Sequence, residues 1–452
     1  MKNKIELHLK HYIWLFLPLL YSCHEEQDIP VVIDVNLHIA GDNHTAPLTV
    51  GIEDNTKNAD SYHWTFEGGS PASSDERAPG SVTFAAPGEH AVTLEAWNAG
   101  NKAEKTYTVR VDSAVVAAFD LTPYINNYAP ATFLISNHSS GGTSYQWQFP
   151  GGTPSAYTGA TPPPVEYKEA GTYEITLSVS NGSASFSAKQ TVSVRESLAA
   201  SFRIVPSFED EDDMEAPLRA TFDVKLQGVE SLRWSCEGAT ISRPDQTDAS
   251  AYFPQAGTYE VWLEVSNGKD SLRVSQSISV KANSNLRTHH NIRLGINTAS
   301  DSLPVCYSTR LRRAFKINEV PDSLGSQIDI VYLGFNDSFT HNMFVSPSAL
   351  SETPLPELPS ARPTYFVNKI EDSGLRLTPA QFNAMQTDAL LRNINIPQRV
   401  ETDAFFSGDL LPRVVLFETA DGRKGAILVK AMVSDGTKGS YILVDIKVQK
   451  ND

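Results

Sequence analysis

The sequence has 452 residues, which is enough for several domains, and 40% of them are hydrophobic, which suffices for ordinary buried cores. The formal net charge is −16. Because a protein that grips nucleic acid needs a basic face for the phosphates, we expect no nucleic-acid partner.

The first 22 residues are typical of an export signal. Three lysines precede an apolar run over residues 12–22 that is too short to span a bilayer. The run ends in Leu20-Tyr-Ser-Cys23, which resembles the lipobox of bacterial lipoproteins, where cleavage occurs before a lipid-bearing cysteine. We predict a signal peptide over residues 1–22, lipidation at Cys23 and membrane attachment through that lipid alone. An ordinary secretory signal with an incidental cysteine is the alternative. The acidic linker 23–29 is similar to the surface-export signal of Bacteroidota lipoproteins.

Residues 30–284 contain one pattern three times. Trp64, Trp147 and Trp234 lie 83 and 87 residues apart, and each precedes by 23 or 24 residues a glycine that opens an alternating segment. In such a segment apolar side chains occupy one face of a strand and polar side chains the other. A unit of about 85 residues with a central tryptophan is typical of a β-sandwich. We predict sandwiches over residues 30–113, 114–197 and 198–284.

The repeated segments resemble the PKD family of immunoglobulin-like modules. The family pattern Pro-Gly-x-Tyr-x-Val-x-Leu-x-Val-x-Asn is matched by Ala170-Gly-Thr-Tyr-Glu-Ile-Thr-Leu-Ser-Val-Ser-Asn181, with Ala170 for the proline and Ile175 for the first valine. The family's preceding Gly-Asp-Gly-like turn lacks its aspartate in all three repeats. The aromatic residue of the pattern corresponds to a corner tyrosine, which would be Tyr173 and Tyr259, with His90 at that place in the first repeat. The resemblance implies tandem immunoglobulin-like sandwiches and no particular ligand.

Two features are peculiar to the third repeat. Cys236 stands where the other repeats have Phe66 and Phe149, so we expect a small buried hydrophobic residue and no disulfide with Cys306. The acidic run 209–215 would suit calcium, which binds several carboxylates, but it lacks the spaced Asp-x-Asp-x-Asp-Gly pattern. We therefore expect a solvated, self-repelling loop and no metal.

Residues 285–452 are expected to form a C-terminal β-rich ligand-binding domain, here called the head. Strands are predicted over 328–334, 412–419, 425–433 and 441–448, the last three joined by Asp-Gly turns. One helix is predicted within 377–393, because Thr378, Pro379 and Gln381 form a capping box. The Pro- and Ser-rich segment 346–363 is predicted to be a long loop. The fold class is therefore all-β, with tandem immunoglobulin-like (PKD) β-sandwiches followed by a mostly β domain with one helix.

No catalytic motif is present among Gly-x-Ser-x-Gly, His-Glu-x-x-His and the phosphate-binding loop, so we predict no enzyme and no cofactor. Cys306 with His289 or His290 could be drawn as a thiol site, but only membership of one domain links them. Aromatic and polar residues interleave after the strand 328–334, a mixture that suits the flat C–H face and the hydroxyls of sugars. Core packing is the alternative for each aromatic. The predicted ligand-binding residues are Phe335, Asn336, Asp337, Phe339, His341, Asn342, Arg362 and Tyr365, with Phe405 and Phe406 in a further loop.

The whole layout resembles the surface glycan-binding lipoproteins of Bacteroidota polysaccharide-utilisation systems. That resemblance implies an outer-membrane, lipid-anchored, cell-surface protein whose head binds an oligosaccharide or polysaccharide. Its partners would be an outer-membrane importer and the importer's lipoprotein lid, with the PKD-like domains as a spacer. One alternative is haem capture, as in HmuY-like haemophores, with His341 and Met343, or His289 and His290, as axial ligands. Another is an adhesin that acts through the PKD modules.

Overall fold

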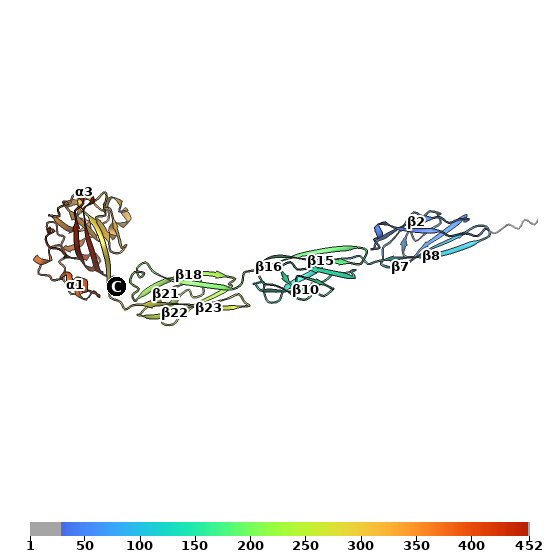
Figure 1. The fold of residues 1–452 in the computed structure, drawn as a ribbon, viewed down its shortest axis with the longest axis horizontal. Coiled ribbons are helices and arrows are strands. Elements are labelled where there is room, and N and C mark those ends of the chain that lie inside the picture. The colour runs from blue at the N-terminus through green and yellow to red at the C-terminus, as the bar shows by residue number, and fades with distance from the viewer. Residues whose placement is uncertain (1–28, 451–452) are drawn as a thin grey trace, which may run out of the picture. The chain divides into compact units, whose positions relative to one another are not determined.

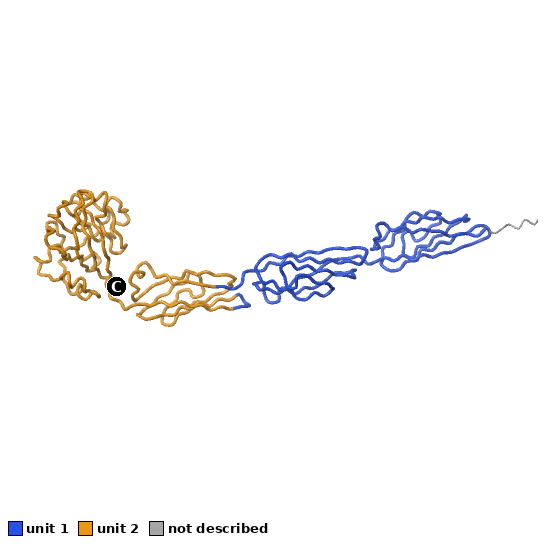
Figure 2. Tube along the Cα trace, viewed as in Figure 1, with its two compact units in different colours: residues 1–199, 267–270 blue, residues 200–266, 271–452 orange. Residues whose placement is uncertain are grey.

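The computed structural model describes residues 29–450, so the predicted signal peptide and Cys23 lie outside the described residues. The chain forms two compact units, shown in Figure 2. One comprises residues 1–199 with 267–270 and contains two β-sandwiches; the other comprises residues 200–266 with 271–452 and contains a third sandwich and the head. Figure 1 shows the elements in chain order.

The first sandwich packs the sheet β1-β2-β6-β4 against the sheet β5-β3-β7-β8, with antiparallel pairing throughout. Its strands are β1 (Val35–Ile39), β2 (Leu48–Asp54), β3 (Ser61–Phe66), β4 (Gly69–Ser70), β5 (Ser73–Ser74), β6 (Ser81–Phe84), β7 (Gly88–Trp97) and β8 (Lys102–Val111). Within β7 every second residue from His90 to Ala96 is buried, as the alternation predicts.

The second sandwich repeats this arrangement, with sheets β12-β14-β10-β9 and β13-β11-β15-β16. Its strands are β9 (Phe119–Pro123), β10 (Ala131–Asn137), β11 (Ser144–Gln148), β12 (Gly152–Thr153), β13 (Ala156–Thr158), β14 (Val165–Tyr167), β15 (Gly171–Ser180) and β16 (Ser185–Val194).

The third sandwich has sheets β17-β18-β21-β20 and β19-β22-β23. Its strands are β17 (Ala199–Pro206), β18 (Leu218–Gln227), β19 (Ser231–Cys236), β20 (Thr240–Ser242), β21 (Ser250–Phe253), β22 (Gly257–Ser266) and β23 (Ser271–Val280).

One buried tryptophan organises each sandwich. Trp64, Trp147 and Trp234 are at most 2% exposed. Each indole Nε1 donates a hydrogen bond of 3.0 to 3.1 Å to the backbone carbonyl 12 residues later. A buried indole N–H needs such a partner, because leaving it unpaired would cost free energy. The accepting carbonyl lies 12 residues after the tryptophan in all three repeats, so this local contact is common to them.

The corner residues also repeat. The hydroxyls of Tyr173 and Tyr259 donate to carbonyls four residues earlier, at 2.9 and 2.8 Å. In the first sandwich Nε2 of His90 lies 2.8 Å from the carbonyl oxygen of Ala86, again four residues earlier, and its Nδ1 lies 3.0 Å from that of Glu67. The imidazole therefore occupies the corner position and contacts a second carbonyl.

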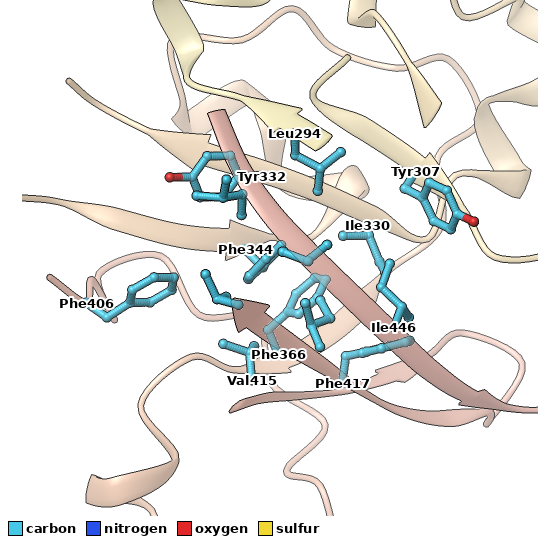
Figure 3. Packing of buried hydrophobic residues seen from close by; sticks show 14 of the residues in the cluster. Leu294, Tyr307, Ile330, Tyr332, Phe344, Phe366, Phe406, Val415, Phe417 and Ile446 are labelled. Atoms are coloured by element: carbon cyan, nitrogen blue, oxygen red, sulfur yellow. The ribbon is translucent and has the colours of Figure 1, made fainter. Parts of the chain in front are cut away.

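The head is built from two antiparallel sheets. The larger has the order β24 (Leu286–Gly295), β32 (Tyr441–Gln449), β31 (Lys424–Val433), β30 (Arg413–Thr419), β29 (Thr364–Val367). The smaller has the order β26 (Arg313–Phe315), β25 (Cys306–Ser308), β27 (Ile330–Gly334), β28 (Asn342–Val345). The cluster in Figure 3, which includes Tyr332, Phe344, Phe366 and Phe417, fills the space between them.

Both outer faces of the head are covered as well. Helical segments bring Phe382 and Leu391 onto the outer face of the larger sheet, over Leu416. The loop 346–363 brings Leu350 and Leu358 onto the outer face of the smaller sheet. Burial on both faces explains why β27 and β30 are apolar almost without alternation.

The predicted capping box is confirmed: the backbone N–H of Gln381 donates to Thr378 Oγ1, and that of Thr378 donates to Gln381 Oε1. The predicted helix, however, is divided in two, because Met385 has an extended backbone. The helices are α1 (Pro379–Ala384), α2 (Ala389–Arg392) and α3 (Gly436–Gly439), with 3-10 turns η1 (Ala40–Asp42), η2 (Asn297–Ala299), η3 (Ile317–Glu319), η4 (Asp322–Gln327), η5 (Pro347–Glu352) and η6 (Ile370–Asp372). Of the residues described, none lies in a helix long and apolar enough to cross a membrane.

Candidate binding surface

Two loops of the head lie side by side at the end of β27. Residues 335–341 join β27 to β28, and residues 403–410 precede β30. Asn342 and Phe406 exchange backbone hydrogen bonds of 3.0 and 2.9 Å, and the N–H of Gly408 donates to the carbonyl of Phe339 at 3.1 Å. We call residues 335–341 and 403–410 the two-loop surface.

Three rings form a cluster on this surface. Phe335 is 40% exposed and stands edge-on to Phe405, with ring centroids 5.4 Å apart. The imidazole of His341 lies 5.9 Å from the same phenyl ring. Aromatic groups in this arrangement offer a shallow apolar platform to a ligand.

The first loop is closed by the side chain of Asn336. Its Nδ2 donates to Thr340 Oγ1 at 2.7 Å, and its Oδ1 accepts from the backbone N–H of Thr340 at 3.2 Å. Asp337 follows and is partly exposed. A loop held in this way loses little conformational entropy when a ligand binds.

Two of the predicted ligand-binding residues face inward. Phe339 is 5% exposed and has φ of 50°. Asn342 is fully buried, and its Nδ2 donates to the carbonyls of Phe339 and Phe406 at 2.6 and 3.1 Å. The hydroxyl of Tyr332 donates to its Oδ1 at 2.7 Å. Phe339 and Asn342 therefore shape the loops from inside.

Arg362 and Tyr365 lie apart from the ring cluster. Arg362 is exposed and lines a hollow of about 120 Å³ together with Arg310, Gln327 and Asp421. Tyr365 packs against the apolar cluster beneath the helices. The structure thus brings together Phe335, Asn336, Asp337 and His341 of the predicted set and adds Phe405.

The hollow beside Arg362 is bounded by charges that satisfy one another. Arg423 contacts Asp329 at 3.3 Å, and Thr309 donates to Asp329 from its backbone N–H at 2.8 Å. Burial raises the pKa of Asp329, and Arg423 and Thr309 oppose that shift. Burial would also raise the pKa of Asp421, but hydrogen bonds from Thr419 and Arg310 and the charge of Arg423 hold it at about 2. These groups brace the head and leave little hydrogen-bonding capacity for a ligand.

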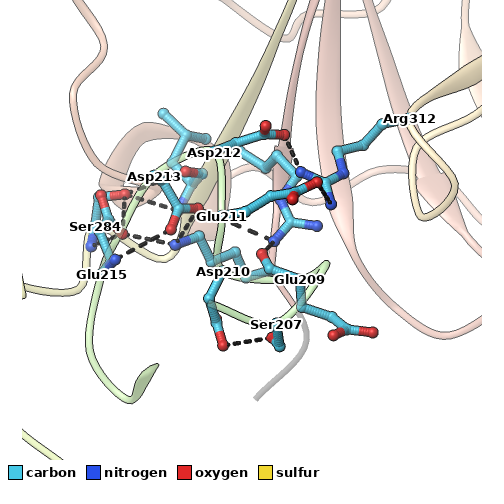
Figure 4. A network of polar contacts seen from close by, with 12 residues as sticks. Ser207, Glu209, Asp210, Glu211, Asp212, Asp213, Glu215, Ser284 and Arg312 are labelled. Atoms are coloured by element: carbon cyan, nitrogen blue, oxygen red, sulfur yellow. Dashed lines mark hydrogen bonds and ion pairs between the residues drawn. The ribbon is translucent and has the colours of Figure 1, made fainter. Parts of the chain in front are cut away.

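The acidic run 209–215 is not a freely solvated loop, which corrects our expectation. Figure 4 shows that its carboxylates contact the head. Glu211 and Asp212 pair with Arg312, whose side chain is only 9% exposed. Asp213 and Glu215 pair with Lys450 at 2.8 and 2.7 Å.

Further contacts complete this junction between the third sandwich and the head. The guanidinium of Arg312 stacks 3.7 Å above the ring of Phe208, and Arg287 donates to the carbonyl of Glu209. Glu215 also accepts from the backbone N–H and the hydroxyl of Ser284 at 2.8 and 2.9 Å. Sequence reasoning missed the junction because its partners are up to 235 residues apart. Across residues 29–450 no group of three or more His, Cys, Asp or Glu is placed to hold a metal ion.

The histidines named for haem do not form axial pairs. His289 is buried against Tyr307, and burial and the charges of Arg287 and Arg312 lower its pKa to about 4. His290 is exposed and contacts Asp445.

His341 is also exposed, whereas Met343 is 1% exposed within the apolar cluster under the smaller sheet. The thiols of Cys236 and Cys306 are free. Cys306 is buried, which raises its pKa to about 12, and Cys236 is half-buried.

Comparison with known proteins agrees with the fold. Residues 34–111 and 117–194 each match the model of the PKD domain. Together these two segments cover less than half of the chain. PKD and immunoglobulin-like folds are typically non-catalytic and are consistent with an adhesin-like or extracellular module. No curated protein matches the chain.

Solved structures with similar chains are multidomain immunoglobulin-like and fibronectin-like proteins. A three-immunoglobulin-domain structure of titin has 14% identity and a TM-score of 0.31, covering 56% of this chain and 99% of that one. Sidekick-1 immunoglobulin domains 1–5 have 13% identity and a TM-score of 0.25, covering 56% and 59%. The fibronectin(III)-like modules of Clostridium thermocellum CbhA have 16% identity and a TM-score of 0.21, covering 36% and 95%. At these scores we draw no functional argument from them.

Proposed function

We propose that this protein is a non-enzymatic cell-surface lipoprotein that captures an oligosaccharide or polysaccharide on the two-loop surface of its head. Lipid at Cys23 anchors it to the outer membrane. The sandwiches act as a spacer, and the captured glycan is passed to an outer-membrane importer and its lipoprotein lid.

The observation that carries the proposal is the ring cluster of Phe335, Phe405 and His341 on braced loops. A sugar ring offers C–H groups to an aromatic face and hydroxyls to amides and carboxylates. Asp337 supplies a partly exposed carboxylate on the same loop, and the bonds of Asn336 to Thr340 hold that loop closed. The charged hollow near Arg362 fits a ligand less well, because Arg310, Asp329 and Asp421 in its lining are already paired.

The test is native affinity electrophoresis of the chain from residue 24 in gels cast with a panel of plant, host and microbial polysaccharides. We expect one glycan to retard the protein. Phe335→Ala and Phe405→Ala should each weaken binding about tenfold, the scale of roughly 1.4 kcal/mol for one lost stacking contact. Phe186→Ala is the matched control, since Phe186 is 53% exposed but lies on the second sandwich.

Three outcomes would overturn the proposal. If the glycan still retards both Phe335→Ala and Phe405→Ala, the binding site lies outside the two-loop surface. Retardation by a chain that ends at residue 284 would favour an adhesin acting through the sandwiches. A Soret band on adding haemin, with no retardation, would favour haem capture.

A further inference from the structure

The end of the first sandwich where the chain enters carries exposed apolar side chains. Ile29, Val32 and Trp97 are 58%, 51% and 36% exposed. Asn98, at the tip of the β7–β8 hairpin, donates from Nδ2 to the carbonyl of Ile29 at 2.9 Å, so the hairpin tip and the entering chain share one end. Figure 1 shows β7 and β8 of this hairpin. We call Ile29, Val32 and Trp97 the entry end.

The hairpin tip at the corresponding end of the second sandwich is polar and meets the first sandwich, although Val116, the counterpart of Val32 there, is also 52% exposed. Ser180 stands in the place of Trp97, and Asn181 in the place of Asn98. Asn181 donates from Nδ2 to Thr45 Oγ1 of the first sandwich at 3.1 Å, and Ser183 donates to Asp112 at 2.9 Å. Both hairpin tips carry an asparagine, and the difference between the two ends is the residue before it: a serine in the sandwich that meets a protein surface and Trp97 at the entry end.

The predicted lipid attachment site lies close to the entry end in the sequence. Cys23 lies six residues before Ile29, and six extended residues span at most about 20 Å. A lipid on Cys23 would therefore keep the entry end within about 20 Å of the membrane surface. Tryptophan favours the membrane–water boundary, where its ring is apolar and its N–H remains hydrated.

We propose that the entry end rests on the lipid surface, with Trp97 in the headgroup layer and Ile29 and Val32 beside it. This inference rests on the lipidation of Cys23 in the proposed function and is independent of what the head binds. Contact through these side chains in addition to the tether would limit the tilt of the first sandwich on the membrane.

A sugar is the competing occupant of Trp97, since an open hollow of about 590 Å³ lies beside its ring. The polar groups around this hollow are already engaged. Lys102 pairs with Glu95 at 2.7 Å, and His63 pairs with Asp75 at 2.6 Å. The hydroxyls of a sugar would have to break the Lys102–Glu95 and His63–Asp75 pairs to bond with these side chains. A lipid surface in contact with the Trp97 ring would leave both pairs intact, so the membrane is the favoured occupant.

The experiment measures tryptophan emission of the full-length lipoprotein reconstituted into phosphatidylethanolamine–phosphatidylglycerol vesicles, with and without dibrominated phosphatidylcholine. Bromine quenches only tryptophans close to the lipid. We expect bromolipid to lower the emission of the wild-type protein and of the matched control Trp262→Phe, and this loss to disappear in Trp97→Phe. Trp97→Ser, which installs the residue of the second sandwich, should abolish it too, and since Trp97 is exposed, both variants should keep the wild-type melting temperature.

Emission that is unchanged by bromolipid in the wild type, or lowered equally in Trp97→Phe, would overturn the proposal. Emission of Trp97 that responds to oligosaccharide without vesicles, and not to bromolipid, would assign the ring to a sugar instead. If the wild-type chain fractionates with the soluble Cys23→Ser variant, the premise of lipidation fails. The quenching by bromolipid does not depend on glycan binding by the head. Absence of glycan binding in the electrophoresis test would therefore leave the membrane contact of Trp97 unaffected.

Discussion

The core of a sandwich and the junction below the head hold the chain together by opposite means. In the second sandwich Trp147 is fully buried, packs among apolar side chains and needs one hydrogen bond. At the junction Arg312, Arg287 and Lys450 of the head meet the acidic run 209–215. Apolar packing should be nearly indifferent to salt and pH, whereas paired charges should respond to both. The sandwich repeats should therefore tolerate changes of salt and pH, whereas the attachment of the head to the third sandwich should be weakened by them.

Replacing the central tryptophan should have the largest effect. We expect Trp147→Ala to destabilise the second sandwich by about 3–5 kcal/mol, because it leaves a large cavity and orphans a carbonyl that accepted the indole N–H. Differential scanning calorimetry of the full chain should show one transition lowered and the others unchanged. The shift should be the same at 0.1 and 1 M NaCl. If salt strongly altered the shift in melting temperature caused by Trp147→Ala, the sandwich core would not be independent of charge.

Removing the central cation of the junction should have a smaller effect that depends on salt. Arg312→Ala removes the pairs with Glu211 and Asp212 and the stacking on Phe208, and we expect a loss of about 1–3 kcal/mol at low salt. The unit of residues 200–266 and 271–452 should melt earlier, and proteolysis near residue 209 should be faster.

The matched control for this change is Arg203→Ala. Arg203 pairs with Asp223 at 2.7 Å, but its side chain is 77% exposed, so its removal should cost little. If Arg203→Ala destabilises as much as Arg312→Ala, the partial burial of the junction has no energetic role. In 1 M NaCl, where the screening length is about 3 Å, the effect of Arg312→Ala should shrink towards that of the control.

The junction should also respond to pH through His289. Burial and the charges of Arg287 and Arg312 lower its pKa to about 4, below its ordinary value of 6.5. The unfolded chain takes up a proton near pH 6.5 and the folded chain does not, so the stability from this group is complete above pH 6.5 and is lost as the pH falls towards 4. Melting temperatures at pH 7.5 and 4.5 should differ less in His289→Phe than in the wild type. His290→Phe changes the exposed neighbour and is the control. In this variant the melting temperatures at pH 7.5 and 4.5 should differ as much as they do in the wild type.

The same contrast explains what could be predicted from the sequence. The sandwiches repeat a pattern whose contacts are local: each tryptophan bonds 12 residues ahead and each corner residue four residues back. Such contacts follow from strand alternation and turn spacing, so the all-β fold was predicted correctly. The capping box at Thr378 was predictable for the same reason.

The binding surface and the junction depend on contacts between distant segments. Nothing in the order of residues indicates that residues 403–410 lie against residues 335–341, or that Asn342 is turned inward by Tyr332 and Phe406. A run of carboxylates looks self-repelling until the arginines opposite it are placed. The loop after β27 could be named from its composition, but which of its rings are accessible required the packing.

The smallest expected effect returns to the sandwiches, at the one place where a repeat departs from the pattern. His90→Tyr would install the corner residue of the other repeats, with its hydroxyl able to donate to the carbonyl of Ala86 as Tyr173 and Tyr259 do in their repeats. The histidine also contacts the carbonyl of Glu67, so the substitution would keep one of its two polar contacts and lose the other. We therefore expect the melting transition of the first sandwich to change by less than about 1 kcal/mol, the net worth of one hydrogen bond. Tyr259→His in the third sandwich is the reciprocal change and should be similarly mild. A loss of several kcal/mol in His90→Tyr, with Tyr259→His tolerated, would show that the contact with Glu67 is essential to the first sandwich and that its corner is not interchangeable with the others.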